Sequence, residues 1–165
     1  MRWISTVVCL LSVAACSPAA ERSQAAGAAD TAFASMQERG KAAMGVDQYT
    51  SSHIFESLPD GGRIVLQRDD ADSAGTEAIR AHLSSIAVAF SAGQFDIPGF
   101  VHAQTVPGTA VMAAQRATLT YVMDTLPRGG EVRIHSSDST SVLAIHEFLA
   151  FQRDAHHAMA HENAP

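Results

Sequence analysis

The chain has 165 residues, of which 47% are hydrophobic and 17% charged, and its formal net charge at pH 7 is −6. A mildly acidic chain without a basic patch lacks the electrostatic footprint of nucleic-acid-binding proteins, so we expect no nucleic acid among its partners. Once a short N-terminal segment is set aside, the remaining length suits a single domain with its own hydrophobic core.

Residues 1–15 have the features of a secretory signal, with a positive charge at Arg2, an apolar run and small residues before Cys16. The apolar run is too short to cross a bilayer, which takes about 20 residues. The sequence Val13-Ala14-Ala15-Cys16 resembles the lipobox of bacterial lipoproteins, whose cysteine carries a lipid. This resemblance implies a membrane anchor on Cys16. Ser17 in place of aspartate implies the outer membrane, facing the periplasm. The alternative is an ordinary cleaved signal peptide.

The only other cysteine, Cys9, lies inside the predicted signal, so a lipid on Cys16 leaves the mature chain without a thiol. We therefore expect no disulfide, no thiolate nucleophile and no cysteine metal ligand. Residues 16–29 are rich in alanine, serine and glutamine, and they are predicted to form a flexible tether between the lipid and the fold.

A regular succession of elements follows the tether. A helix is predicted over 30–43, with a weak apolar side. Strands are predicted over 53–58 and 63–68, separated by a proline-glycine turn. The helix predicted over 76–92 has one continuous apolar face, formed by Ile79, Leu83, Ile86 and Phe90.

The stretch 93–117 lacks clear periodicity, and we expect a functional loop or a short helix near 110–115. Two further strands are predicted over 118–124 and 131–136, and a last helix over 139–157. The second half repeats the first, because the turn Leu58-Pro59-Asp60-Gly61-Gly62-Arg63-Ile64 is echoed by Leu126-Pro127-Arg128-Gly129-Gly130-Glu131-Val132, and Ile79 and Leu83 by Ile145 and Leu149.

This repeat predicts an α+β fold class. A duplicated β-β-α unit forms a four-stranded antiparallel sheet with two helices on one face, plus an N-terminal helix. Residues 30–157 form this single domain in the prediction, and 158–165 form a disordered tail. The other face of the sheet is left open to bind a ligand, to pack the N-terminal helix or to dimerise.

Short motifs over about 41–156 occur together in this chain: Met44-Gly45-Val46-Asp47-Gln48, His53-Ile54-Phe55, Asp60-Gly61-Gly62, Ile79-Arg80-Ala81-His82-Leu83, Val101-His102, Pro107-Gly108 with Met112, Arg128-Gly129-Gly130 and Ile145-His146-Glu147-Phe148-Leu149. Together they resemble a family of small exported bacterial proteins of unknown function. The resemblance implies no catalytic residue. Some relatives bear the name aspartate carbamoyltransferase, but this chain is too short for the two α/β domains of that enzyme and lacks its Ser-Thr-Arg-Thr phosphate loop.

The chain has eight histidines, the most notable excess in its composition. Imidazole suits copper and zinc, and thioether suits Cu(I). We predict a copper or zinc site formed by four histidines: His53 at the start of a strand, His82 and His146 on the two repeat-related helices, and His102 in the long loop. Met44 and Met112 lie in predicted irregular segments nearby.

Two alternatives accompany this prediction. His82 and His146 border apolar helix faces, where a histidine can simply be hydrogen-bonded at the edge of the core. The C-terminal histidines, His156, His157 and His161, are expected to belong to a solvated tail.

Motifs for catalysis are mostly absent. His146-Glu147 begins like the zinc-protease motif His-Glu-x-x-His, but Ala150 replaces the second histidine. Asp69, Asp70 and Asp72 lie between a strand and a helix, where carboxylates cap the helix. The sequence therefore favours a lipid-anchored binding protein for a transition metal or a small ligand, and not an enzyme. The alternative is an envelope interaction module that uses the open sheet face to form a homodimer or to dock an envelope protein. A hydrolase with a histidine as general base is the third interpretation.

Overall fold

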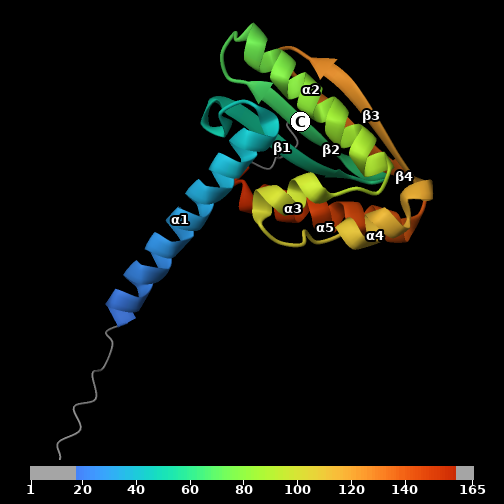
Figure 1. The fold of residues 1–165 in the computed structure, drawn as a ribbon. Coiled ribbons are helices and arrows are strands. Elements are labelled where there is room, and N and C mark those ends of the chain that lie inside the picture. The colour runs from blue at the N-terminus through green and yellow to red at the C-terminus, as the bar shows by residue number, and fades with distance from the viewer. Residues whose placement is uncertain (1–17, 159–165) are drawn as a thin grey trace, which may run out of the picture. The chain divides into compact units, whose positions relative to one another are not determined.

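The computed structural model describes residues 18–158, and the side chains of residues 26–158. The chain divides into two compact units, Met1–Thr31 and Ala32–Pro165. The predicted signal, Cys16 and the predicted tail from residue 159 onward lie outside the described residues. The sheet (Figure 1) belongs to the second unit. The residues of the hydrophobic core belong to it as well. None of the helices in the described part is long and apolar enough to span a membrane.

Helix α1 (Pro18–Met44) begins earlier than the sequence predicted, because it includes most of the segment assigned to a flexible tether. Alanine has the most favourable helix propensity, and a proline at the first position of a helix removes no hydrogen bond. The helix ends at Met44. The next residue, Gly45, adopts a positive φ of 80°, and its N–H donates to the carbonyl of Lys41 at 2.8 Å.

Four antiparallel strands form one sheet in the order β1-β2-β4-β3: β1 (Ser51–Leu58), β2 (Gly61–Arg68), β3 (Leu119–Leu126) and β4 (Gly129–Ser136). The predicted sheet is confirmed. Strands β2 and β4 begin two residues earlier than predicted because their glycine pairs belong to the strands, β1 also begins two residues earlier, and β3 ends two residues later. Gly61 shows why glycine is needed, since an added Cβ would lie 2.2 Å from the carbonyl oxygen of Ile134 on β4.

Helices α2 (Ser73–Ser91) and α5 (Ser139–Ala155) each begin after an aspartate cap. Asp72 accepts a hydrogen bond from the N–H of Gly75, and Asp138 accepts one from Ser141. Helix α2 packs mainly on β3 and β4, whereas α5 packs on β1 and β2 (Figure 1). Each helix therefore covers the hairpin of the other β-β-α unit, and the predicted duplication is confirmed.

The core lies between these two helices and the sheet. The predicted apolar faces are buried there, and each such side chain contributes roughly 1.5–3 kcal/mol by leaving water. The central residues are Ile64, Leu66, Ile79, Leu83, Val132, Ile134, Ile145 and Leu149.

The long stretch between α2 and β3 contains helices α3 (Asp96–His102) and α4 (Thr109–Ala114) and a short 3-10 helix, η2 (Arg116–Thr118). Helix α4 matches the short helix that was one of the two alternatives for this stretch, and α3 was not predicted. Pro98 hid α3 from a sequence-based interpretation, but it lies in the first turn, where its missing N–H costs nothing. As a consequence, His102 is the last residue of a helix and does not lie in a loop.

Candidate functional site

A small cavity of about 70 Å³ brings four histidines together. Its walls come from α1, β1, β2, α2, α3, α5 and the 3-10 helix η1 (Gln48–Thr50). Its polar lining consists of four imidazoles and two amides, and Met44 and several aromatic and aliphatic side chains form the rest. The polar lining residues are His53, His82, His102, His156, Gln48 and Gln152.

Three of the four histidines predicted to form a site line this cavity: His53, His82 and His102. His146 does not. Its Nε2 lies 2.9 Å from the carbonyl oxygen of Leu58 at the end of β1, so this histidine donates to the hairpin turn. The fourth imidazole is that of His156, which was predicted from the sequence to belong to a solvated tail. It follows α5 directly and is half-buried.

Each imidazole in the cavity has a polar partner in the protein. Nε2 of His102 lies 2.8 Å from Oε1 of Gln152, and Nδ1 of His156 lies 3.2 Å from Oε1 of Gln48. An amide oxygen only accepts hydrogen bonds, so Nε2 of His102 and Nδ1 of His156 are the donors. In the neutral ring, the remaining nitrogen (Nδ1 of His102 and Nε2 of His156) therefore carries a lone pair. The other two imidazoles have backbone partners, Ser51 for His53 and Ala43 for His82, and these hydrogen bonds only partly oppose the lowering of both pKa values by burial.

Burial keeps these imidazoles neutral. It lowers the pKa of His53 to about 4, and together with the neighbouring His53 and His102 it lowers the pKa of His156 to about 3. Burial also lowers the pKa values of His82 and His102. At neutral pH the cavity therefore holds unprotonated rings, which is the form that binds a metal.

His156 lies at the centre of the cluster. Its ring centroid is 5.6 Å from that of His53 and 5.1 Å from that of His102. Two imidazoles that share one metal through bonds of about 2.0 Å have ring centroids roughly 5–6 Å apart. The rings of His53 and His156 are stacked, with 12° between their planes. A nitrogen lone pair lies in the plane of its ring, so one of these stacked rings must turn before both lone pairs point at one ion. In the present positions, no group of three or more His, Cys, Asp or Glu residues in the described part of the chain forms a site for a metal ion.

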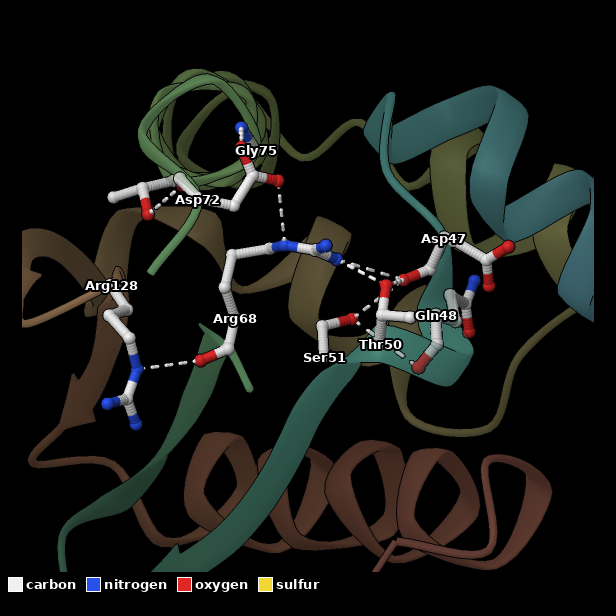
Figure 2. Close-up of polar contacts among 9 residues, drawn as sticks. Asp47, Gln48, Thr50, Ser51, Arg68, Asp72, Gly75 and Arg128 are labelled. Carbon is white, nitrogen blue, oxygen red and sulfur yellow. Dashed lines mark hydrogen bonds and ion pairs between the residues drawn. The ribbon is translucent and has the colours of Figure 1, made fainter. Parts of the chain in front are cut away.

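Gln48, the partner of His156, is held by its surroundings. Gly40 on α1 makes room for it, since a Cβ on Gly40 would lie 1.3 Å from Nε2 of Gln48. Figure 2 shows Arg68 lying between the start of α2 and the η1 helix that carries Gln48. Arg68 donates from Nη1 to Oγ1 of Thr50 at 2.5 Å, and its Nε lies 3.1 Å from the carboxylate of Asp72. Arg68 therefore ties η1 to the sheet and to α2.

The repeat gives the cavity residues on β1, β2, α2 and α5, and His156 after α5, counterparts in the other half. In the strands the counterpart lies 68 residues further on, as Leu126 follows Leu58, and in the helices 66 residues further on, as Ile145 follows Ile79. His53 then corresponds to Tyr121, and Phe90 to His156. The ring of Phe90 packs on that of Tyr121 at 5.9 Å, as the ring of His156 packs on that of His53.

The other two polar residues of these elements also have apolar counterparts, since His82 corresponds to Phe148 and Gln152 to Ile86. The correspondence was the signal that could have identified His156 from the sequence. A residue aligned with the predicted core residue Phe90 does not belong to a solvated tail.

The sheet face away from the helices carries charges. Arg63 contacts Glu56 at 2.5 Å and Glu131 at 3.4 Å, and Arg133 pairs with Asp60. Val122 is exposed on this face, but its partner across the strands is the charged Arg133. The face therefore differs from the exposed apolar surface that an apolar dimer interface needs.

Comparison of the chain with protein-family models, with curated proteins and with solved structures found no match.

Proposed function

We propose that the protein binds a transition metal ion, copper or zinc, in this cavity through the neutral imidazoles of His53, His102 and His156. The observation that carries the proposal is the convergence of imidazoles with lowered pKa values on one small cavity. Metal-bound histidines usually donate their second ring N–H to a protein acceptor, which fixes the tautomer and the ring. Gln152 and Gln48 have that relation to His102 and His156.

The size of the cavity favours an ion over an organic ligand. Sites for drug-sized molecules measure roughly 300–1,000 Å³, whereas one water needs about 10–15 Å³. A cavity of about 70 Å³ has room for an ion with a few waters and is too small for most metabolites.

The repeat supports a role beyond packing. The other half fills the equivalent place with Phe90 and Tyr121, and their aromatic rings complete the core there without any imidazole. Stacking alone therefore does not require histidine at positions 53 and 156. Compared with Tyr121 and Phe90, the side chains of His53 and His156 add nitrogen lone pairs that can bind a metal.

The proposal includes a place in the cell, which rests on the sequence alone. The protein is anchored by a lipid on Cys16 to the bacterial outer membrane and faces the periplasm. Replacement Cys16→Ser tests this part by itself. The variant is expected to leave the membrane fraction and to lose incorporation of a labelled fatty acid, and an unchanged distribution would refute the anchor.

The metal is tested with variants that use the protein's own repeat. The double variant His53→Tyr/His156→Phe places in the cavity the residues of the other half, so it is expected to fold and to lose metal. The matched control, His146→Arg, also takes the residue of the other half, Arg80, and is expected to keep metal. All proteins carry His157→Ala and His161→Ala, which remove other C-terminal imidazoles.

Each protein is titrated with Cu(I), Cu(II) and Zn(II) against competing chelators. We expect one equivalent bound more tightly than about 1 μM, a free energy of about −8 kcal/mol, in the control and not in the double variant. Binding weaker than micromolar in the control, or equal binding in the two, would refute the proposal.

A further inference from the structure

The lining of the cavity carries no charge. Among the described residues that form its wall, none is an aspartate, glutamate, lysine, arginine or cysteine. Charged groups act on it from outside: the positive charge of Arg39 lowers the pKa of His102, and the negative charge of Asp69 raises that of His53. Their signs are opposite, so they give the cavity no compensating negative charge.

The charge of a cation in this cavity is therefore not neutralised by any side chain of the described wall. The cost of taking an ion out of water grows with the square of its charge in a continuum description, so a divalent ion costs about four times as much as a monovalent ion of the same size. With neutral ligands and an apolar wall, formed by side chains such as Phe55, Ile86 and Phe148, a monovalent ion has the advantage.

The wall also contains a soft ligand. Met44, the last residue of α1, lines the cavity and is 6% exposed. Thioether sulfur prefers Cu(I), whereas zinc sites in proteins use thiolate, imidazole and carboxylate. The oxygens of Gln48 and Gln152 already accept hydrogen bonds from His102 and His156, and the described part of the wall holds no carboxylate, the ligand that a hard divalent ion prefers.

Building on the proposed metal site, we infer that its ion is Cu(I), bound by the thioether of Met44 together with imidazoles from His53, His102 and His156. The protein is then a carrier or buffer for reduced copper. Gln48 and Gln152 are positioning residues in this arrangement, because they hold two of the imidazoles by hydrogen bonds and do not touch the ion.

The test compares Met44→Leu with Met112→Leu. Both replacements keep the volume of a buried side chain nearly constant. Met112 is fully buried in the core and does not line the cavity, so it controls for the loss of a core thioether. Cu(I) affinity is measured without oxygen against a chromophoric Cu(I) chelator, Zn(II) affinity against a zinc indicator, and the copper environment by X-ray absorption.

We expect Cu(I) to bind more tightly than Zn(II). Met44→Leu should lower Cu(I) affinity by at least about tenfold, as losses around a metal typically do, and leave Zn(II) affinity unchanged. It should also remove the signal of a sulfur neighbour from the copper X-ray absorption spectrum. Met112→Leu should change neither the metal affinities nor the spectrum. Thermal unfolding of both variants shows whether the fold is kept.

The outcomes separate this inference from the proposed function. Histidine-dependent binding of Zn(II) or Cu(II) that exceeds Cu(I) binding would overturn the inference and leave the metal function standing. Tight Cu(I) binding without a sulfur neighbour, and with no effect of Met44→Leu, would overturn the assigned ligand set. No tight binding of any of these ions would overturn both.

Discussion

The two helix-hairpin pairs of this protein have the same backbone plan and different interiors. Where α2 meets β3 and β4, the space is filled with aromatic rings: Phe90 packs on Tyr121, Phe95 and Phe148 with centroids 4.5–5.9 Å apart. Where α5 meets β1 and β2, the equivalent rings belong to His53 and His156. A cavity remains beside these rings, and α2 contributes part of its wall, including Phe90. Both repeats form the same backbone structure. Positions at which their residues differ therefore indicate a role that only one repeat has.

The same comparison explains His146. It corresponds to Arg80 on α2, which donates to the carbonyl of Leu126 at 3.0 Å. His146 donates to Leu58, the counterpart of Leu126, at 2.9 Å. Both side chains fasten a helix to the end of the hairpin beneath it. His146 therefore has the role of its counterpart in the fold and is not a member of the histidine cluster.

The largest effect on stability is expected from an imidazole at position 90, where the ring of Phe90 packs on that of Tyr121 and also forms part of the cavity wall. Phe90→His is expected to lower the free energy of unfolding by about 2–4 kcal/mol, because the smaller ring loses packing against Tyr121, Phe95 and Phe148. The reverse change at the equivalent position, His156→Phe, should lower the free energy of unfolding by less than about 1.5 kcal/mol. Urea denaturation of the metal-free proteins measures both values. Equal costs would show that the two interiors do not differ as described.

The halves should also differ in their response to acid. The folded-state pKa of His53, about 4, lies below the value of 6.5 for an unfolded chain, so the unfolded state binds more protons as the pH falls. The stabilising contribution of neutral His53 to the free energy of unfolding is fully present above pH 6.5. It is lost progressively as the pH falls towards 4, by roughly 3 kcal/mol for His53 alone. His156, with a pKa of about 3, acts in the same direction.

Urea denaturation of the metal-free protein between pH 7 and pH 4 measures this loss. In His53→Tyr/His156→Phe the slope should be much flatter, since neither new side chain takes up a proton in this range. A slope unchanged from that of the parent protein would show that other groups cause the acid sensitivity.

A subtler change acts through a partner of the cluster. In Gly40→Ala the new Cβ displaces Gln48, which is expected to cost about 1–3 kcal/mol by leaving buried polar groups unpaired. The better helix propensity of alanine returns only about 1 kcal/mol. Metal affinity should fall by roughly tenfold, because His156 loses its acceptor.

Gly27→Ala is the control, because it lies on the same helix with nothing within 4 Å of an added Cβ. It should change metal affinity not at all and raise the helix content slightly by circular dichroism. If Gly40→Ala behaves like Gly27→Ala, Gln48 is not a positioning residue.

Most of the fold was predictable because its signals are local. Alternating strands, two glycine-bearing turns and the apolar faces of α2 and α5 specify the sheet and the side on which the helices pack. Helix α3 was missed, since Pro98 and Gly99 normally argue against a helix. The N-terminal helix was placed too late, because its alanine-rich beginning has no apolar periodicity for a sequence-based prediction to follow.

The site was only partly predictable, because it depends on contacts distant in the sequence. His53, His82 and His102 were singled out by residue type alone. Their meeting depends on α5 crossing to the hairpin of the other unit, which local patterns do not show. Position 156 follows the end of α5, where residue type alone suggested a frayed tail, and Gln48 reaches His156 over 108 residues of sequence.

The smallest effects are expected where the two halves have the same role. His146→Ala removes one hydrogen bond at the end of β1 and should cost about 0.5–1.5 kcal/mol, with no change in metal affinity. Arg80→Ala removes bonds to both Leu126 and Gly129 and should cost more. Thermal unfolding and a Cu(I) titration of both variants measure these effects. Loss of metal in His146→Ala at nearly unchanged stability would show that this imidazole serves the ion. The correspondence with Arg80 would then describe the backbone plan but not the chemistry.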